Sequence, residues 1–218
     1  MKVNHIILAS SLLLAGVTGP ATTAFAAGAP IQSSTKGDVN FTQSATPLTI
    51  DKASDIHFGT QSISAKEETY SAKMDNDGKT DVANAVQVTD IRGTNIGWKL
   101  QVAQGAQLTT KDTAAKELTG AEITLDNINL TTDADNQAGV PTGGAKIALV
   151  PGTTATPGAA FDVAVAQQDQ GMGTWKANFG DDQSGATSIN LKVPGATAKV
   201  KDSVYETSLI WTLADTPA

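Results

Sequence analysis

The sequence predicts an all-β domain, an antiparallel β-sandwich or a barrel-like fold with long loops and little helix. Short runs of apolar and β-branched residues alternate with polar residues, and glycine, proline, asparagine and aspartate separate these runs. Helix signals are few, and the strongest is a turn or two at 113–118 with Asp112 as the capping residue. The chain has no cysteine, so its fold must depend on a hydrophobic core without disulfides.

Residues 1–26 have the composition of a secretory signal peptide. Lys2 precedes an apolar run at 6–17, and an A-x-A cleavage sequence follows at 24–26. The apolar run is shorter than the roughly 20 residues that a membrane-spanning helix needs. We therefore expect cleavage after Ala26, a secreted chain and no membrane insertion.

The remainder of the chain predicts one domain preceded by a short lead-in. Residues 27–38 are polar and lack periodicity, which indicates a flexible N-terminal segment, and we expect order to begin near Val39. Residues 39–218 are enough for one domain that buries roughly 70% of its unfolded surface. The predicted strands lie, in order, at 86–88, 97–102, 121–125, 146–150, 161–165, 189–193 and 205–213. Most of 131–157 is predicted to be loop, where we expect partner specificity to lie.

Charge narrows the classes of partner. Loss of Lys2 with the signal peptide leaves 14 basic and 22 acidic residues, a net charge of −8. Nucleic acid, anionic lipid and teichoic acid would repel such a protein. The chain has no sortase sorting sequence and no lipobox cysteine, so we expect attachment to a surface, if any, to be non-covalent.

Two segments place a tryptophan and a leucine on the same face of an extended chain. In the first, Trp98 and Leu100 share a face with Val102, while Lys99 and Gln101 share the other. The last predicted strand repeats this alternation until Pro217 ends any ladder pairing. One face of that strand carries Tyr205, Thr207, Leu209, Trp211 and Leu213.

These tryptophans have two interpretations. As core residues each would contribute on the order of 4 to 6 kcal/mol, an upper bound from about 150 to 250 Å² of buried area. As exposed residues they would form a platform on which sugar rings stack. The core is favoured, because aromatic residues make up only 5% of the chain and few others are available to fill it. We expect Trp98→Ala and Trp211→Ala each to cost about 3 to 5 kcal/mol in that case.

The spacing of the motifs is similar to that of a known family. The terminal pattern Tyr205-x3-Leu209-x-Trp211-x-Leu213-x3-Pro217 resembles the C-terminal signature of WxL-domain proteins. The stretch 88–93 running into 97–100 resembles their upstream W-x-L element, and 48–59 and 173–195 resemble two further family segments. The resemblance covers about 41–217. On these motifs the chain is identified as a small, single-domain member of the WxL-domain cell-surface proteins of Gram-positive bacteria.

The resemblance implies a secreted protein that binds Gram-positive peptidoglycan without a covalent anchor and has no enzymatic activity. It also implies assembly with other WxL proteins and with a larger membrane-anchored surface partner, and in some members adhesion to host matrix protein or plant polysaccharide. It does not identify the side chains that contact the wall. The alternative is a protein-interaction subunit that docks onto the membrane-anchored partner or a host matrix protein, so that wall binding is indirect.

The residues themselves offer little for catalysis. His57 is the only histidine after the signal peptide and lies next to a predicted turn, and thiol mechanisms are absent. Paired carboxylates at 181–182, 75/77 and 133/135 are typical of turns in glycine-rich segments. We therefore expect no enzyme, no cofactor and no nucleic-acid partner.

One acidic segment has a second interpretation. Asp75, Asp77 and Asp81 alternate as the ligands of calcium loops do, but Gly78 falls too early for an EF-hand and Val86 occupies the position of its last glutamate. The sequence favours a hairpin turn here, with calcium binding as the alternative.

Overall fold

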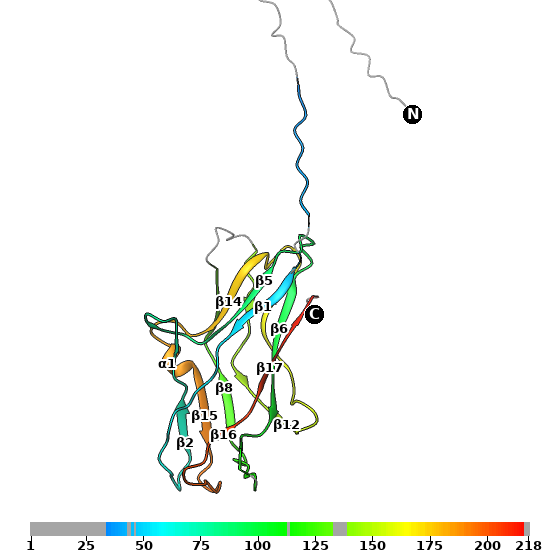
Figure 1. The fold of residues 1–218 in the computed structure, drawn as a ribbon. Coiled ribbons are helices and arrows are strands. Elements are labelled where there is room, and N and C mark those ends of the chain that lie inside the picture. The colour runs from blue at the N-terminus through cyan, green and yellow to red at the C-terminus, as the bar shows by residue number, and fades with distance from the viewer. Residues whose placement is uncertain (1–33, 43–44, 46, 113, 133–138, 216–218) are drawn as a thin grey trace, which may run out of the picture. The chain divides into compact units, whose positions relative to one another are not determined.

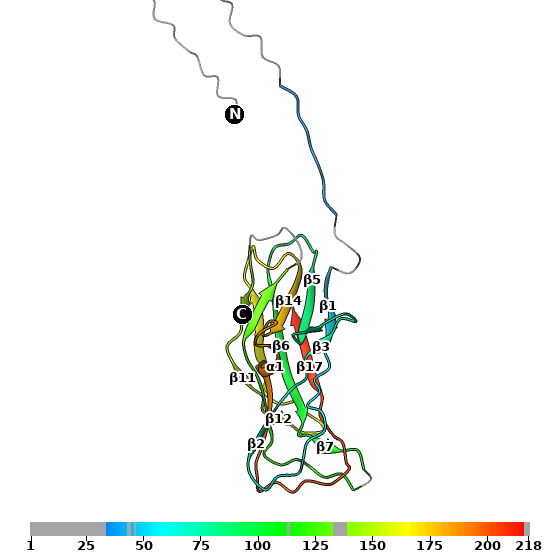
Figure 2. The ribbon, with the colours of Figure 1, turned by 90° about the vertical axis from the view of Figure 1, so that its left-hand side faces the viewer.

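The structure is a computed structural model that describes residues 34–42, 45, 47–112, 114–132 and 139–215. The predicted signal peptide lies outside these residues, and 34–38 are exposed and form neither helix nor strand. From Asn40 onward the described residues form one compact unit (Figures 1 and 2). Strands dominate this unit, and its only helix in the described ranges is the four-residue α1 (Gly185–Ser188). The predicted all-β fold is confirmed.

The first layer of the domain contains two antiparallel sheets in the orders β1-β5-β14-β9 and β11-β8-β15-β2. Their strands are β1 (Leu48–Ala53), β2 (Glu68–Ser71), β5 (Ala85–Asp90), β8 (Glu122–Leu125), β9 (Ile128–Thr131), β11 (Ile147–Ala148), β14 (Gly173–Phe179) and β15 (Ile189–Val193). The central strand β14 is followed in the chain by β15, which is the central strand of the second sheet. On one side β14 pairs with β5 and β15 with β2, and on the other side β14 pairs with β9 and β15 with β8. The two sheets are therefore one ladder that is interrupted at a single level.

Two insertions meet at that interruption. Residues 72–84 contain the hairpin of β3 (Asp75–Asn76) and β4 (Asp81–Val82), and 180–188 contain α1. Backbone hydrogen bonds close the gap, from Ala72 N to Ile189 O at 2.8 Å and from Phe179 N to Asn84 O at 2.9 Å. These two bonds connect the backbones of the two sheets across the interruption and satisfy four backbone groups there.

The second layer is built around the long strand β6 (Trp98–Ala106). On one side β6 pairs with β13 (Phe161–Ala166) and, in parallel, with β12 (Pro151–Gly152), and β10 (Thr142–Gly143) lies beyond β13. On its other side β6 pairs with β17 (Leu209–Ala214). In Figure 1, β6 and β17 lie next to each other and to the right of β1, β5 and β14. Figure 2 shows the same strands from the side. A small separate pair joins β7 (Thr109–Thr110) to β16 (Tyr205–Glu206).

The core lies between the two layers and follows the predicted alternation. Its largest fully buried side chains come from β5, β6, β8, β13, β14 and β15. They include Trp98, Trp175, Phe179, Leu100, Leu125 and Ile189. The predicted strands at 86–88, 97–102, 121–125, 161–165 and 189–193 are confirmed by β5, β6, β8, β13 and β15. At 146–150 only Ile147–Ala148 forms a strand.

Two predictions of local structure are wrong. The described residues of 113–118 form no helix, because Thr110 N bonds to Lys116 O at 2.9 Å and Leu118 N to Leu108 O at 2.8 Å, which folds the segment back onto β7. The last strand is not continuous. It breaks at Thr207 and Ser208 into β16 and β17, which pair with different strands. Among the described helices none is long and apolar enough to cross a membrane.

Candidate functional site

The fold brings the two W-x-L motifs together on adjacent strands. In the antiparallel register of β6 and β17, Leu213 lies opposite Leu100 and Trp211 opposite Val102. The motifs are separated by more than half of the domain in sequence, yet they pair directly in the second layer (Figure 1). Their inner faces therefore pack against one part of the core, and their outer faces form one continuous surface.

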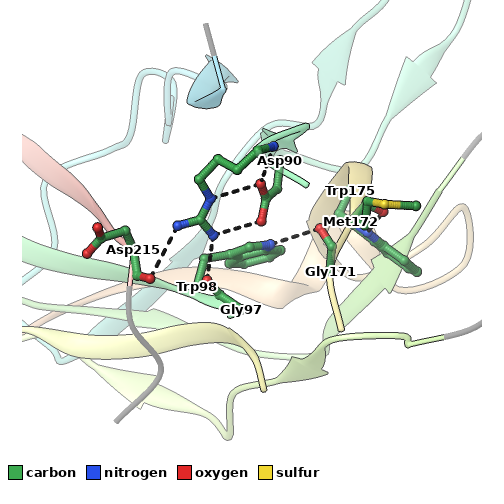
Figure 3. Close-up of polar contacts among 8 residues, drawn as sticks. Asp90, Gly97, Trp98, Gly171, Met172, Trp175 and Asp215 are labelled. Atoms are coloured by element: carbon green, nitrogen blue, oxygen red, sulfur yellow. Dashed lines mark hydrogen bonds and ion pairs between the residues drawn. The ribbon is translucent and has the colours of Figure 1, made fainter. Parts of the chain in front are cut away.

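The first motif is closed to solvent. Trp98 and Leu100 are 1% and 0% exposed, and the Trp98 Nε1 donates a hydrogen bond of 2.9 Å to the carbonyl of Gly171 (Figure 3). Gly171 has a φ of +76° and packs so closely that a Cβ there would lie 2.4 Å from the Trp98 Nε1. The left-handed conformation and the contact both favour glycine. Trp98 cannot serve as a platform for a sugar ring.

The second motif is only half-buried. Leu209, Trp211 and Leu213 pack against the core from its margin, and the Trp211 ring lies 6.0 Å from the Phe179 ring at an angle of 42°. On the outer face Ile210 and Thr212 are exposed. The predicted alternation of faces therefore holds along β17.

The ends of this motif lie apart from β17. Tyr205 belongs to β16, is partly buried, and its hydroxyl accepts a hydrogen bond of 2.9 Å from Val200 N. Pro217 lies outside the described residues. Tyr205 therefore lies on a separate short strand that pairs with β7, and not on the strand that carries Trp211.

A buried ion pair joins the two motif strands to β5. Arg92, the only arginine of the chain, forms two hydrogen bonds with Asp90, from Nε to Oδ1 at 2.9 Å and from Nη2 to Oδ2 at 2.8 Å. Nη2 also donates to the carbonyl of Gly97 at 2.6 Å, and Nη1 to that of Asp215 at 3.3 Å (Figure 3). The side chains of Arg92 and Asp90 are 8% and 5% exposed. The hydrogen bonds that Arg92 donates to the Asp90 carboxylate raise the pKa of Arg92 further above its ordinary value.

This ion pair fixes the residue before β6 and the residue after β17 to the same guanidinium group. Residues 88–93 resemble a family segment, but the ion pair itself was not predicted from the sequence. One feature of the sequence could have indicated the ion pair: the chain has a single arginine among fourteen lysines, and it lies two positions after an aspartate. A planar guanidinium group suits a buried bidentate pair better than an ammonium group does. Trp175 was also not singled out, although it is 2% exposed and its Nε1 donates to the Met172 carbonyl at 3.1 Å (Figure 3).

The outer face of the second layer carries a polar hollow beside the first motif. Its volume is about 270 Å³ and it is open to solvent. Asp162 on β13 accepts a hydrogen bond of 2.7 Å from Gln101 Nε2, and the Lys99 Nζ lies 3.6 Å from its other oxygen. The hollow is lined by Lys99, Thr142, Gly143, Gly144, Asp162, Val165 and Gln167.

Two of the residues that line the hollow are glycines at points where the backbone packs closely. A Cβ at Gly144 would lie 2.3 Å from the Asp162 carbonyl oxygen, and one at Gly143 would lie 2.7 Å from the Ile128 carbonyl oxygen. The remaining groups are an ammonium, a carboxylate, amides and a hydroxyl. Such a set can donate and accept hydrogen bonds with a hydroxyl-rich ligand. Its described lining residues include no serine nucleophile and no histidine that could activate one.

The residues considered for other chemistry have structural partners. His57 is exposed, and its backbone carbonyl accepts a hydrogen bond of 2.8 Å from Lys73 N. Asp181 accepts hydrogen bonds from Ser184 Oγ and from the backbone of Gln183 and Ser184 in the turn before α1, and these bonds lower its pKa. Asp133 and Asp135 lie outside the described residues.

The predicted hairpin at 75–81 is confirmed by the pairing of β3 with β4. Asp77 accepts hydrogen bonds from Lys79 N and Thr80 N, which lower its pKa, and Gly78 takes a φ of +89° at the tip. Asp75 accepts hydrogen bonds from Ser54 Oγ at 2.7 Å and from Lys52 Nζ at 3.0 Å. These carboxylates point to different partners, and the described residues contain no cluster of three or more ligand side chains that could hold a metal ion.

A model of the WxL domain, described as a surface cell wall-binding domain, matches residues 17–217. This chain belongs to the WxL family. The match covers nearly the whole chain, as expected for a small member with a single WxL domain. No curated protein and no solved structure matches the chain. The paired strands β6 and β17 are therefore the two W-x-L elements of one WxL domain, and cell-wall association at the surface follows from membership of the family.

Proposed function

We propose that this WxL domain binds peptidoglycan directly and non-covalently after secretion, and that it does so without catalysing a reaction. The observation that carries the proposal is the match of a surface cell wall-binding family over residues 17–217. The signal-like sequence at 1–26 supports export. With a net charge of −8 after its removal, the protein would be repelled by anionic wall polymers, which favours the less charged glycan strands as its target.

The outer face of the second layer is our candidate for the contact with the wall. The inner face of the first motif is closed, since Trp98 and Leu100 are buried. On the outer face Lys99, Gln101 and Asp162 surround an open hollow that presents hydrogen-bond donors and acceptors. Sugar hydroxyl and acetamido groups of a glycan match such groups. In this proposal the motif builds the sheet, and the outward residues between its members contact the ligand.

The test is co-sedimentation of the purified mature protein with bare sacculi of a Gram-positive bacterium. We expect the protein to pellet with the sacculi and a Lys99→Ala/Asp162→Ala double variant to remain largely in the supernatant. The matched control is Lys192→Ala/Glu122→Ala, which removes another surface ion pair, of 3.7 Å, from the first layer. Melting temperatures of both variants separate loss of binding from loss of fold. Failure of the folded wild-type protein to pellet at any salt or calcium concentration would show that wall retention is indirect.

A further inference from the structure

The second motif strand forms a free edge of the second layer. β17 pairs with β6 on one side, and no described strand pairs with its other side. Gly105 N bonds to Ser208 O at 2.8 Å, and the alternation of an antiparallel ladder then directs the backbone groups of Ile210 and Thr212 toward β6. Consequently the N–H and C=O groups of Leu209, Trp211 and Leu213 point outward. The bond from Gly158 N to the carbonyl of Gln104, which lies opposite Leu209, agrees with this alternation.

This edge lacks the usual protection against pairing with another chain. Proteins blunt exposed edges with charges, proline or bulges. The other six-residue edge strand, β1, carries Asp51 and Lys52 and has a bulge between Ile50 and Lys52. β17 has the sequence LIWTLA and its six register pairs run without a bulge. An uncharged, regular edge of this length is a site to which a further strand adds readily.

The side chains along the edge indicate what such a strand would carry. Leu209, Trp211 and Leu213 are partly buried, and among the described residues no strand lies beyond β17 to cover their outer side. On the opposite face Ile210 is 37% exposed. An added strand with apolar residues at alternate positions would complete the burial of the first three, since side chains of neighbouring strands on one face contact each other.

The chain itself contains a segment of this kind. In the sequence Val39-Asn40-Phe41-Thr42 apolar and polar residues alternate, and these residues form no helix or strand. Val39 is 76% exposed and Phe41 is 87% exposed, the two largest exposures among the large apolar side chains of the described residues. Exposed aromatic and aliphatic residues in an extended segment are the features by which a peptide adds to a sheet edge.

We propose that residues 39–42 of a second copy add to the free edge of β17 as an antiparallel strand, with Val39 and Phe41 beside Trp211 and Leu213. The same chain is poorly placed to supply this strand. Its Pro47 carbonyl accepts a hydrogen bond from Ile91 N, and the adjacent Arg92 contacts Asp215 at the end of β17. A segment that reaches Pro47 at this end of β17 runs parallel to β17, and parallel pairing is the less stable arrangement. Assembly through the edge is independent of the proposed wall binding.

Two variants separate the donor from the acceptor. Phe41→Asp places a charge in the donated segment but leaves the edge intact, whereas Ile210→Lys protects the edge but leaves the segment intact. The controls are Thr35→Asp, which adds the same charge upstream, and Ile63→Lys, which changes an isoleucine that is 61% exposed elsewhere in the chain. Sedimentation equilibrium of the mature protein from about 1 μM to about 1 mM covers moderate to weak association.

We expect the wild-type protein and both controls to self-associate. In each test variant the dissociation constant should rise by roughly tenfold or more, so that the variant stays largely monomeric at concentrations where the wild-type protein associates. An equimolar mixture of Phe41→Asp and Ile210→Lys should form a dimer, because one copy still offers the edge and the other the segment. Unchanged melting temperatures confirm that both variants fold. A monomeric wild-type protein, association that survives either test variant, or a mixture that stays monomeric overturns the proposal.

Discussion

The two W-x-L motifs have the same tripeptide pattern but different positions in the sheet. β6 lies between β13 and β17, so Trp98 and Leu100 are covered on both sides and are 1% and 0% exposed. Within the part of the chain that the structure describes, β17 has a neighbouring strand on one side only, and Trp211 and Leu213 are half-buried. The position of a strand in its sheet, rather than the motif, decides how completely its apolar face is removed from water.

The two rings also differ in their polar contacts. The Trp98 Nε1 has a buried acceptor, the Gly171 carbonyl, whereas within the described residues the ring nitrogen of Trp211 has no hydrogen bond. Buried indole groups usually find such a partner, and partly exposed ones can use water. The first motif is therefore a structural element of the domain. The second keeps an aromatic side chain at a margin where a further chain can cover it.

The largest effect is expected from Trp98→Ala. The substitution removes a fully buried ring and leaves the Gly171 carbonyl without its donor, so we expect a loss of about 4 kcal/mol in the free energy of unfolding. Urea unfolding followed by tryptophan fluorescence and circular dichroism measures it. Thr212→Ala, an exposed change on the neighbouring strand, should stay within about 0.5 kcal/mol. Equal losses in the two variants would contradict the assignment of Trp98 to the core.

The next largest effect is expected from Arg92→Ala, which removes the guanidinium group and should lower the free energy of unfolding by about 3 kcal/mol. The variant leaves the Asp90 carboxylate, only 5% exposed, without its partner, and breaking one side of a buried pair is costly. It also removes the donors to Gly97 and Asp215, so β17, the edge strand, should lose more protection than β6 in hydrogen exchange. Arg92→Lys restores the charge but not the bidentate geometry and should recover only part of the stability. Uniform loss of protection would mean that the ion pair does not anchor the edge.

A smaller effect is expected from Trp211→Ala, about 2 kcal/mol, because the side chain is only partly buried and its aromatic contact is Phe179. This value corrects the expectation from sequence that the two tryptophans cost the same. Trp211→Phe, which keeps an aromatic contact with Phe179, should recover most of the loss. The comparison is made at a protein concentration at which the chain is monomeric, and a cost of Trp211→Ala equal to that of Trp98→Ala there would contradict the partly exposed position of Trp211.

The alternation of residues predicted the strands and their buried faces, because a period of two is a local property of the chain. It predicted Ile189–Val193 with its observed bounds and the inward face of β6. It did not predict which strand is central and which is an edge, because pairing of Leu100 with Leu213 depends on contacts between distant segments. The difference in burial between the two tryptophans was therefore not visible in the sequence.

Local breaks were also beyond the pattern. Tyr205–Leu213 alternates without interruption, yet the chain changes partner at Ser208, whose carbonyl is bound by Gly105 N. Residues 113–118 have some helical propensity, but in the described part, 114–118, hydrogen bonds to Leu108 and Thr110 determine the conformation. The hollow beside Lys99 depends on a register that places Asp162 opposite Gln101 across two strands. Each of these features comes from tertiary pairing, which overrides local preference.

The smallest loss of stability is expected from a change at Asp75, which lies outside both motif strands and serves as a reference for them. Hydrogen bonds from Ser54 and Lys52 lower the pKa of Asp75 to about 2, so its carboxylate stabilises the folded state above the ordinary pKa near 4 and loses this contribution as the pH falls from about 4 to about 2. We expect Asp75→Asn to cost about 1 kcal/mol at neutral pH, a modest value because Lys52 is 62% exposed, and progressively less as the pH falls toward 2. Urea midpoints of the wild-type protein and the variant across this range measure the difference, and Asp55→Asn, at an exposed site nearby, is the control.

Since Asp75 bonds to neither β6 nor β17, the difference between Trp98→Ala and Trp211→Ala should be the same at pH 7 and near pH 3. A pH-dependent difference would mean that the hairpin of β3 and β4 is coupled to one motif strand and not to the other.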